Sequence, residues 1–112
     1  MPAETGEPAA RVIIFTMPME SHCAPEKTWA HAADMLRRRL REQYGERVEL
    51  RHVELFSAES FAHEEIMALV RDPSTPPPYI TVDGALIQSG GKLSSRAIRE
   101  SLSARGVEPA SR

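Results

Sequence analysis

The chain has 112 residues, a length that fits one small domain with a modest apolar core. Its formal net charge of −2 offers little attraction for nucleic acid or an anionic membrane surface, so neither is expected as a partner. The sequence contains no apolar run near the ~20 residues that a membrane-spanning helix needs. Its single cysteine cannot close an internal disulfide, and we therefore expect a reducing, cytoplasmic location.

Both ends of the chain are expected to lie outside the folded domain. The stretch 1–10 has neither the basic start nor the apolar core of a signal peptide, and it predicts a disordered tail. Gly106 is expected to stop the last helix, which leaves 106–112 as a loose C-terminal tail. One domain is therefore predicted over residues 11–105, without an internal repeat or linker.

A strand and a helix are predicted first. The β-branched, apolar run V-I-I-F at 12–15 is typical of a buried strand. After a loop, a helix is expected from about Pro25 to Tyr44, because proline and acidic residues suit a first helical turn. Gly45 is a suitable stop for this helix. Its inner face, which we expect Trp29 to anchor, carries Trp29, Ala33, Leu36, Leu40 and Tyr44.

The next segment, R-V-E-L-R-H-V-E-L-F, predicts a strand that is buried on both sides. Val48 and Leu50 alternate on one side of it. After His52 the alternation of apolar and polar residues shifts by one position, so that Val53 and Leu55 point to the other side. A strand that is buried on both sides, as central parallel strands are, tolerates this shift. His52 itself is interpreted as a partly buried strand residue rather than as a ligand.

A second helix is expected after this strand. Ser57 or Ser60 is a suitable N-cap, with Glu59 in or near the first turn. The helix should end near Arg71, because Pro73 disfavours helical geometry in the residue before it. Its apolar stripe consists of Ala62, Ile66, Leu69 and Val70.

Two short strands and a third helix complete the chain. Three prolines precede a strand at Tyr79 to Val82. The pair Asp83-Gly84 is a strong signal for a two-residue hairpin, so Ala85 to Gln88 should return antiparallel. Ser89, Gly90 and Gly91 lead into the last helix, whose inner face carries Leu93, Ala97, Ile98 and Leu102.

The element order predicts an α/β fold with a four-stranded mixed sheet flanked by three helices. Strands that are connected through a helix are parallel neighbours with right-handed crossovers, which describes the first two strands. The hairpin at Asp83-Gly84 and the two helix crossovers together predict that the strand at 79–82 runs antiparallel to the first strand at 12–15.

Three stretches make this sequence resemble the thioredoxin-like superfamily in its glutaredoxin-sized form. V-I-I-F-T followed by a cysteine looks like the first glutaredoxin strand and its active-site loop, and H-C-A-P-E-K at 22–27 is similar to the thioredoxin motif W-C-G-P-C-K. P-P-Y-I-T-V-D-G at 77–84 resembles the cis-proline loop and hairpin of the family. The resemblance covers about 11–103 and implies the order β-α-β-α-β-β-α. It looks most like the bacterial thioredoxin-like proteins that keep the fold without an intact C-x-x-C.

The resemblance implies that Cys23 is the catalytic thiol, supported by His22, Pro25 and Glu26. Glu26 stands where thioredoxins have their second cysteine, so an internal dithiol cycle is excluded. A helix start beside Cys23 would favour the thiolate by ~0.3–1 kcal/mol, whereas the Glu26 carboxylate would oppose it by ~1 kcal/mol. A buried, unreactive thiol is the alternative interpretation of Cys23.

The same resemblance implies a substrate-binding surface made of Pro77, Pro78, Tyr79, Gly90 and Gly91. The bond between Pro77 and Pro78 is expected to be cis, with Pro78 close to the cysteine, so that the preceding backbone can pair with an extended peptide. The glycine pair has two interpretations. It is either a flexible start of the last helix or a cradle of backbone amides for a carboxylate of glutathione.

Three classes of function remain open on the sequence. The leading hypothesis is a monothiol redox protein that forms mixed disulfides with a protein partner or glutathione through Cys23. The second is a binding or scaffold module that keeps the fold without the chemistry. The third is a glutathione-assisted iron–sulfur carrier, although C-A-P-E does not resemble the C-G-F-S loop of monothiol glutaredoxins. Neither a resident cofactor nor a metal site of the chain itself is expected, with glutathione as the open alternative.

Overall fold

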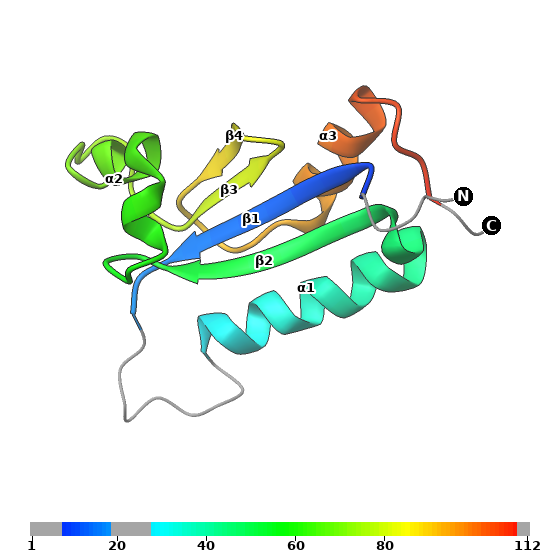
Figure 1. Ribbon diagram of the computed structural model, residues 1–112, viewed down its shortest axis with the longest axis horizontal. Coiled ribbons are helices and arrows are strands. Elements are labelled where there is room, and N and C mark those ends of the chain that lie inside the picture. The colour runs from blue at the N-terminus through cyan, green and yellow to red at the C-terminus, as the bar shows by residue number, and fades with distance from the viewer. Residues whose placement is uncertain (1–7, 19–27, 110–112) are drawn as a thin grey trace.

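The computed structural model describes residues 8–18 and 28–109, whose strands form one four-stranded mixed sheet (Figure 1). The strands are β1 (Ala10–Thr16), β2 (Val48–Glu54), β3 (Tyr79–Val82) and β4 (Ala85–Ser89). Their order in the sheet is β2-β1-β3-β4. β1 and β2 are parallel, whereas β3 is antiparallel to both β1 and β4. The predicted mixed sheet and the antiparallel third strand are therefore confirmed.

Within the described residues, three α-helices cover both faces of the sheet in a thioredoxin-like layout (Figure 1). They are α1 (Trp29–Tyr44), α2 (Glu64–Val70) and α3 (Ser95–Ala104), and two short 3-10 turns, η2 (Gly45–Arg47) and η3 (Ser60–Ala62), precede β2 and α2. Helices α1 and α3 pack on one face and α2 packs on the other. In the same part of the chain, no helix is both long and apolar enough to cross a membrane.

The larger core lies between the sheet and helices α1 and α3. Alternation along β1 sends Val12 and Ile14 to this face. Leu36 and Leu40 of α1 are buried against them at helical spacing, and Ile98 of α3 joins from the other end of the face. Burial of these apolar side chains holds helices α1 and α3 against the sheet.

The smaller core lies under α2 and consists of Phe15, Val53, Leu55, Ile66 and Tyr79. The change of phase predicted in β2 is confirmed, because Val48 and Leu50 are buried in the larger core and Val53 in the smaller one. β2 therefore contributes apolar side chains to both faces, although it is an edge strand of the sheet.

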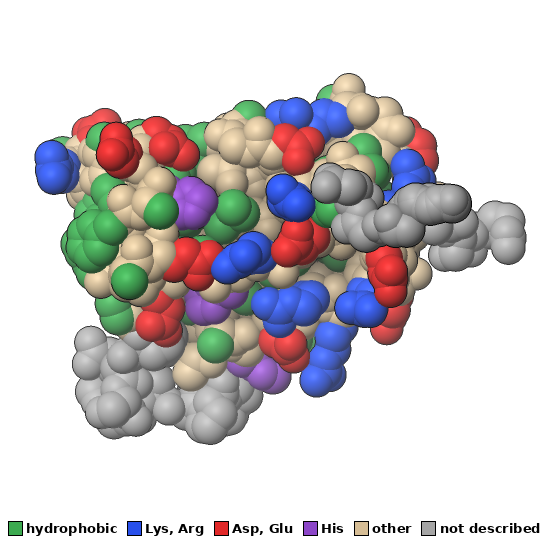
Figure 2. Space-filling view, in the orientation of Figure 1, with side chains coloured by type: hydrophobic (Ala, Val, Ile, Leu, Met, Phe, Trp, Pro, Cys, Tyr) green, Lys and Arg blue, Asp and Glu red, His purple; other side chains and the backbone are tan. Residues whose placement is uncertain are grey.

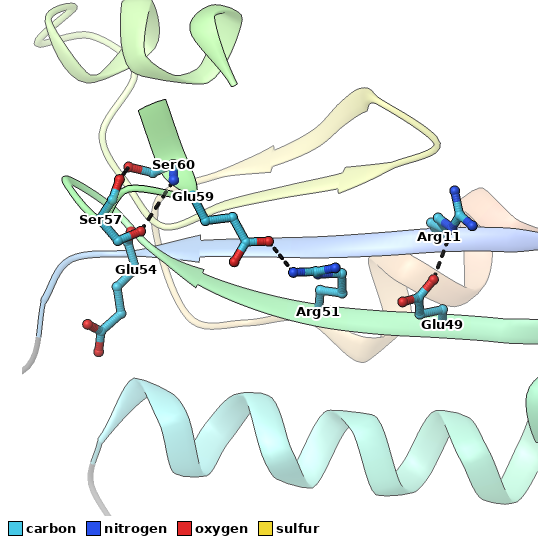
Figure 3. A network of polar contacts seen from close by, with 7 residues as sticks. All are labelled: Arg11, Glu49, Arg51, Glu54, Ser57, Glu59 and Ser60. Atoms are coloured by element: carbon cyan, nitrogen blue, oxygen red, sulfur yellow. Dashed lines mark hydrogen bonds and ion pairs between the residues drawn. The ribbon is translucent and has the colours of Figure 1, made fainter. Parts of the chain in front are cut away.

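Helix α2 is too short to cover its whole face of the sheet. Its 7 residues span ~10 Å, whereas the 7 residues of β1 span ~23 Å. Ion pairs occupy the remainder: Arg11 Nε lies 2.9 Å from Glu49 Oε1, and Arg51 pairs with Glu59. Figure 2 shows basic and acidic side chains alternating over β1 and β2, and Figure 3 shows the two pairs themselves. Charged side chains in ion pairs, and not a helix, therefore cover this part of the sheet.

Helix α1 begins later than the sequence predicted. Thr28 is its N-cap, with extended backbone at ψ 158° and an Oγ1 that accepts a hydrogen bond from the His31 N–H at 3.0 Å. The predicted start at Pro25 is wrong for this helix, because the threonine cap decides where the first turn forms. Trp29 is the first residue of the helix, and its side chain is half-buried and not fully buried. The predicted stop at Gly45 is confirmed, and its φ is 62°.

The predicted second helix is divided into η3 and the short helix α2. Neither Ser57 nor Ser60 caps α2, which begins after His63 without a side-chain cap. Ser60 is instead fully buried, and its Oγ donates to the Ser57 carbonyl at 2.8 Å. Ile66 is buried as predicted, whereas Ala62 belongs to η3 and is exposed.

The folded domain is slightly larger than its predicted boundaries, 11–105. Ala10, which the sequence predicts in the tail, is buried in β1 and pairs with Val48. Val107 is also buried, and its N–H donates to the Leu102 carbonyl at 2.8 Å after the turn at Gly106. The loose C-terminal tail therefore does not begin at Gly106, because the chain closes the larger core one residue later.

Candidate functional site

The candidate site lies where the carboxyl end of β1 meets the start of β3 (Figure 1). Phe15 of β1 pairs with Tyr79, the first residue of β3, so Pro78 lies beside the point where the chain leaves β1. The carboxyl ends of parallel strands are a common position for ligand sites in open α/β sheets. Four predicted site residues follow in the chain and lie outside the described residues: His22, Cys23, Pro25 and Glu26.

The peptide bond between Pro77 and Pro78 is cis, as predicted. Pro78 is buried and its carbonyl accepts a hydrogen bond from the Gly90 N–H at 2.8 Å, while the Pro76 carbonyl accepts one from Ser89 Oγ at 2.7 Å. Among the described residues, no donor reaches the carbonyl of the half-buried Pro77. Since proline has no N–H, Pro77 offers an extended peptide one acceptor and no donor.

Tyr79 anchors the proline loop and does not form a binding surface with its side chain. The ring is fully buried in the smaller core, and its hydroxyl donates to the Thr75 carbonyl at 2.6 Å. Burial raises the pKa of the Tyr79 phenol, and the Asp72 carboxylate raises it further. Asp72 in turn accepts hydrogen bonds from Ser74 and Thr75. The Tyr79 side chain therefore has a structural role, and the predicted part of Tyr79 in substrate binding stays a prediction that only its backbone could fulfil.

The glycine pair follows β4, and Gly90 lies against the proline loop. Gly90 and Gly91 have φ of 80° and 76°, a region that favours glycine at two successive positions. A Cβ on Gly90 would lie 3.3 Å from Pro76 Cγ, so the close approach of the two loops also favours glycine. The Gly90 amide is already bonded to the Pro78 carbonyl, which counts against the anion cradle, one of the two interpretations that the sequence left open. The pair thus acts as a turn that braces the proline loop.

A polar pair that the sequence did not single out lies at the same end of the sheet. Thr16, the fully buried last residue of β1, has its Oγ1 2.7 Å from Nε2 of the half-buried His52 in β2. Burial lowers the pKa of His52; Glu54 opposes this shift and Arg37 adds to it. A neutral imidazole bonded to a hydroxyl can accept or donate a proton at this position. The parallel register, with Ile14 opposite His52, is what brings these two side chains together.

The position at which α1 begins bears on the predicted reactivity of the Cys23 thiol. The cysteine precedes the N-cap Thr28 by five positions in the sequence, so it does not belong to the first turn of this helix. The favourable field of a helix terminus is confined to that turn. The predicted stabilisation of the Cys23 thiolate by a helix start at Pro25 stays a prediction, because Cys23 lies outside the described residues.

The described part of the chain contains no group of three or more His, Cys, Asp or Glu side chains arranged to hold a metal ion. No family model matches this sequence, and no curated protein matches it either. Function is therefore inferred from the residues themselves and from the geometry at the carboxyl end of β1.

Proposed function

We propose that this chain is a thioredoxin-like, monothiol redox protein whose Cys23 forms mixed disulfides with a protein partner or with glutathione. The observation that carries the proposal is the pairing of Phe15 with Tyr79. This pairing places the proline loop beside the end of β1, from which the chain continues toward Cys23. The agreement between the sheet order and the thioredoxin-like layout supports the same assignment.

The reaction needs one thiol and one disulfide. The Cys23 thiolate attacks one sulfur of the partner disulfide, a new S–S bond forms, and the old one breaks. The departing sulfur leaves as a thiolate and takes a proton from solvent. An external thiol must then release the partner, because the chain has no second cysteine. The carbonyl of the half-buried Pro77, to which no described donor bonds, would accept one hydrogen bond from the extended backbone of the partner.

Intact-protein mass spectrometry tests this proposal directly. The protein is incubated with oxidised glutathione and with a cysteine-containing peptide disulfide, and Cys23→Ser is treated in parallel. We expect one adduct per wild-type chain, none on Cys23→Ser, and full reversal by dithiothreitol. Failure of folded wild-type protein to form either adduct, while the unfolded protein reacts, would contradict a redox role for Cys23.

A binding or scaffold module is the second candidate, and the position of Thr28 favours it. With the N-cap at Thr28, Cys23 is not part of the first turn of α1, the position at which a helix start would lower the pKa of a thiol. Under this proposal the proline loop and the end of β1 form a contact surface without thiol chemistry. Unchanged partner binding by Cys23→Ser would support the module, and loss of binding together with the adduct would support the redox protein.

A further inference from the structure

Three large apolar side chains are exposed at the end of the molecule where β1 and β2 finish. We call them the end patch: Met17, Phe56 and Phe61, with 43%, 51% and 58% of their surface exposed. Figure 2 shows hydrophobic side chains gathered at this end, over α2 and the strand ends. Their backbones are linked, since the Leu55 N–H donates to the Thr16 carbonyl at 2.7 Å and the Phe61 N–H to the Ser57 carbonyl at 3.3 Å.

Phe56 is held in a strained conformation that keeps its ring in solvent. Its φ of 68° lies in the left-handed region, which is rare for a bulky side chain and strains the backbone. The turn that follows enforces this conformation. Ser57 donates to the Glu54 carbonyl from its Oγ at 2.6 Å and from its N–H at 3.3 Å, and Ser60 bonds back to Ser57 (Figure 3). A rigid turn that exposes an aromatic ring despite this strain suggests a contact surface.

The segment of the chain that carries Phe56 and Phe61 is acidic. Residues 53–72 contain five acidic residues and one arginine, a net −4 in a chain of net −2, so the remainder of the chain is +2. The acidic residues are Glu54, Glu59, Glu64, Glu65 and Asp72. Glu59 pairs with Arg51, whereas Glu54, Glu64 and Glu65 form no ion pair within the described residues. The neighbourhood of the patch therefore repels an acidic partner and attracts a basic one.

We infer that the end patch binds a segment of a partner protein that carries apolar side chains flanked by lysine or arginine. The apolar side chains of the segment cover Phe56 and its neighbours, and the basic flanks face Glu54, Glu64 and Glu65. Charge complementarity selects this occupant over an acidic segment. The inference goes beyond the proposed function, because the contact needs no thiol and is tested without one.

Fluorescence anisotropy with two labelled, cysteine-free peptides tests the inference on the Cys23→Ser chain. Both probes have the same Leu-Phe-Leu centre, which is flanked by lysines in one peptide and by glutamates in the other. We expect the lysine peptide to bind at least about tenfold more tightly, or ~1.4 kcal/mol. Its affinity should fall as NaCl is raised, because the surface charges are screened. Equal affinity for the two peptides would overturn the inference.

The decisive variant is Phe56→Gly, which removes the ring and leaves a residue that accepts the φ of 68°. We expect it to stay folded and to bind the lysine peptide about tenfold more weakly. Leu86→Ser is the matched control, because Leu86 is 42% exposed on β4 and lies outside the patch. An equal loss of binding in both variants would overturn the inference.

Sedimentation of the wild-type chain examines the other possible occupant, a second copy. A second copy would present its own exposed Met35 beside Arg38 and Arg39 of α1. Self-association that disappears in Phe56→Gly would assign the patch to a second copy and overturn the partner segment. A monomer that still binds the lysine peptide supports the inference.

Discussion

The hydroxyl of Thr16 lies 2.7 Å from Nε2 of His52, and this contact joins the carboxyl ends of the two parallel strands. It is a polar contact on the sheet face that is otherwise lined by the larger apolar core. Thr16 is fully buried, so the hydroxyl depends on the imidazole for a partner. The contact between β1 and β2 at this point therefore depends on the protonation state of His52.

This contact predicts a loss of stability at acidic pH. Burial lowers the pKa of His52 below its ordinary value of 6.5, so the unfolded chain takes up its proton at a higher pH than the native state. Between these two pKa values the unfolded state binds more protons, and the free energy of unfolding falls as the pH is lowered through this window. Above pH 6.5 the contribution is fully present.

Urea denaturation on both sides of this window measures the effect. We expect His52→Gln, whose amide can still reach Thr16, to flatten the dependence of the unfolding free energy on pH. His31→Gln is the matched control, because His31 is exposed on α1. An unchanged pH dependence in His52→Gln would mean that another group is responsible for it.

The hydroxyl of Tyr79 should contribute measurably to the stability of the proline loop. Tyr79→Phe removes its hydrogen bond to the Thr75 carbonyl and should lower the unfolding free energy by ~1 kcal/mol. Tyr44→Phe is the comparison, since Tyr44 is also buried and its hydroxyl has no hydrogen bond within the described residues. Chemical denaturation should show a smaller change for Tyr44→Phe, and a larger one would contradict this assignment.

The half-buried position of Trp29 lowers the expected cost of removing it. Full burial would predict ~3–5 kcal/mol for Trp29→Ala, and half-burial predicts less than ~3 kcal/mol. Leu40→Ala, at a fully buried position of the same helix, should cost ~2–5 kcal/mol. We expect the denaturant midpoint to fall further in Leu40→Ala. The opposite order would make Trp29 the main anchor of α1 after all.

Glu26→Cys discriminates between the redox protein and the scaffold module. The variant has the motif C-A-P-C, with a second thiol three positions after Cys23 and one nearby carboxylate fewer. If Cys23 is a redox thiol, this variant should reduce a model protein disulfide, with a small thiol for recycling, faster than wild type does. Glu26→Ser is the control that removes the charge without adding a thiol. A folded Glu26→Cys protein that forms no internal disulfide on oxidation would favour the module.

Much of the fold could be predicted from local patterns in the sequence. Asp83 and Gly84 have φ of 51° and 87°, the two successive positive values that a two-residue hairpin requires, and this signal is local. The change of phase in β2 was visible because side chains alternate along any strand, so apolar residues on both sides indicate burial on both faces. The cis bond before Pro78 was expected from the resemblance alone and is confirmed.

The site depended on choices that local patterns do not decide. Pro25 and Thr28 are both acceptable residues near a helix start. The tertiary structure decided between them, because the Thr28 side chain accepts a hydrogen bond from the His31 N–H and so caps α1. The contact between Thr16 and His52 joins positions 36 residues apart, so it exists only once β1 and β2 are in register. The hydrogen bond from the Gly90 N–H to the Pro78 carbonyl likewise forms only because β4 pairs antiparallel with β3. Composition and periodicity determined the layers, because burial of apolar surface acts on whole faces. Tertiary structure decided the polar contacts, because a hydrogen bond needs two specific groups within about 3 Å of each other.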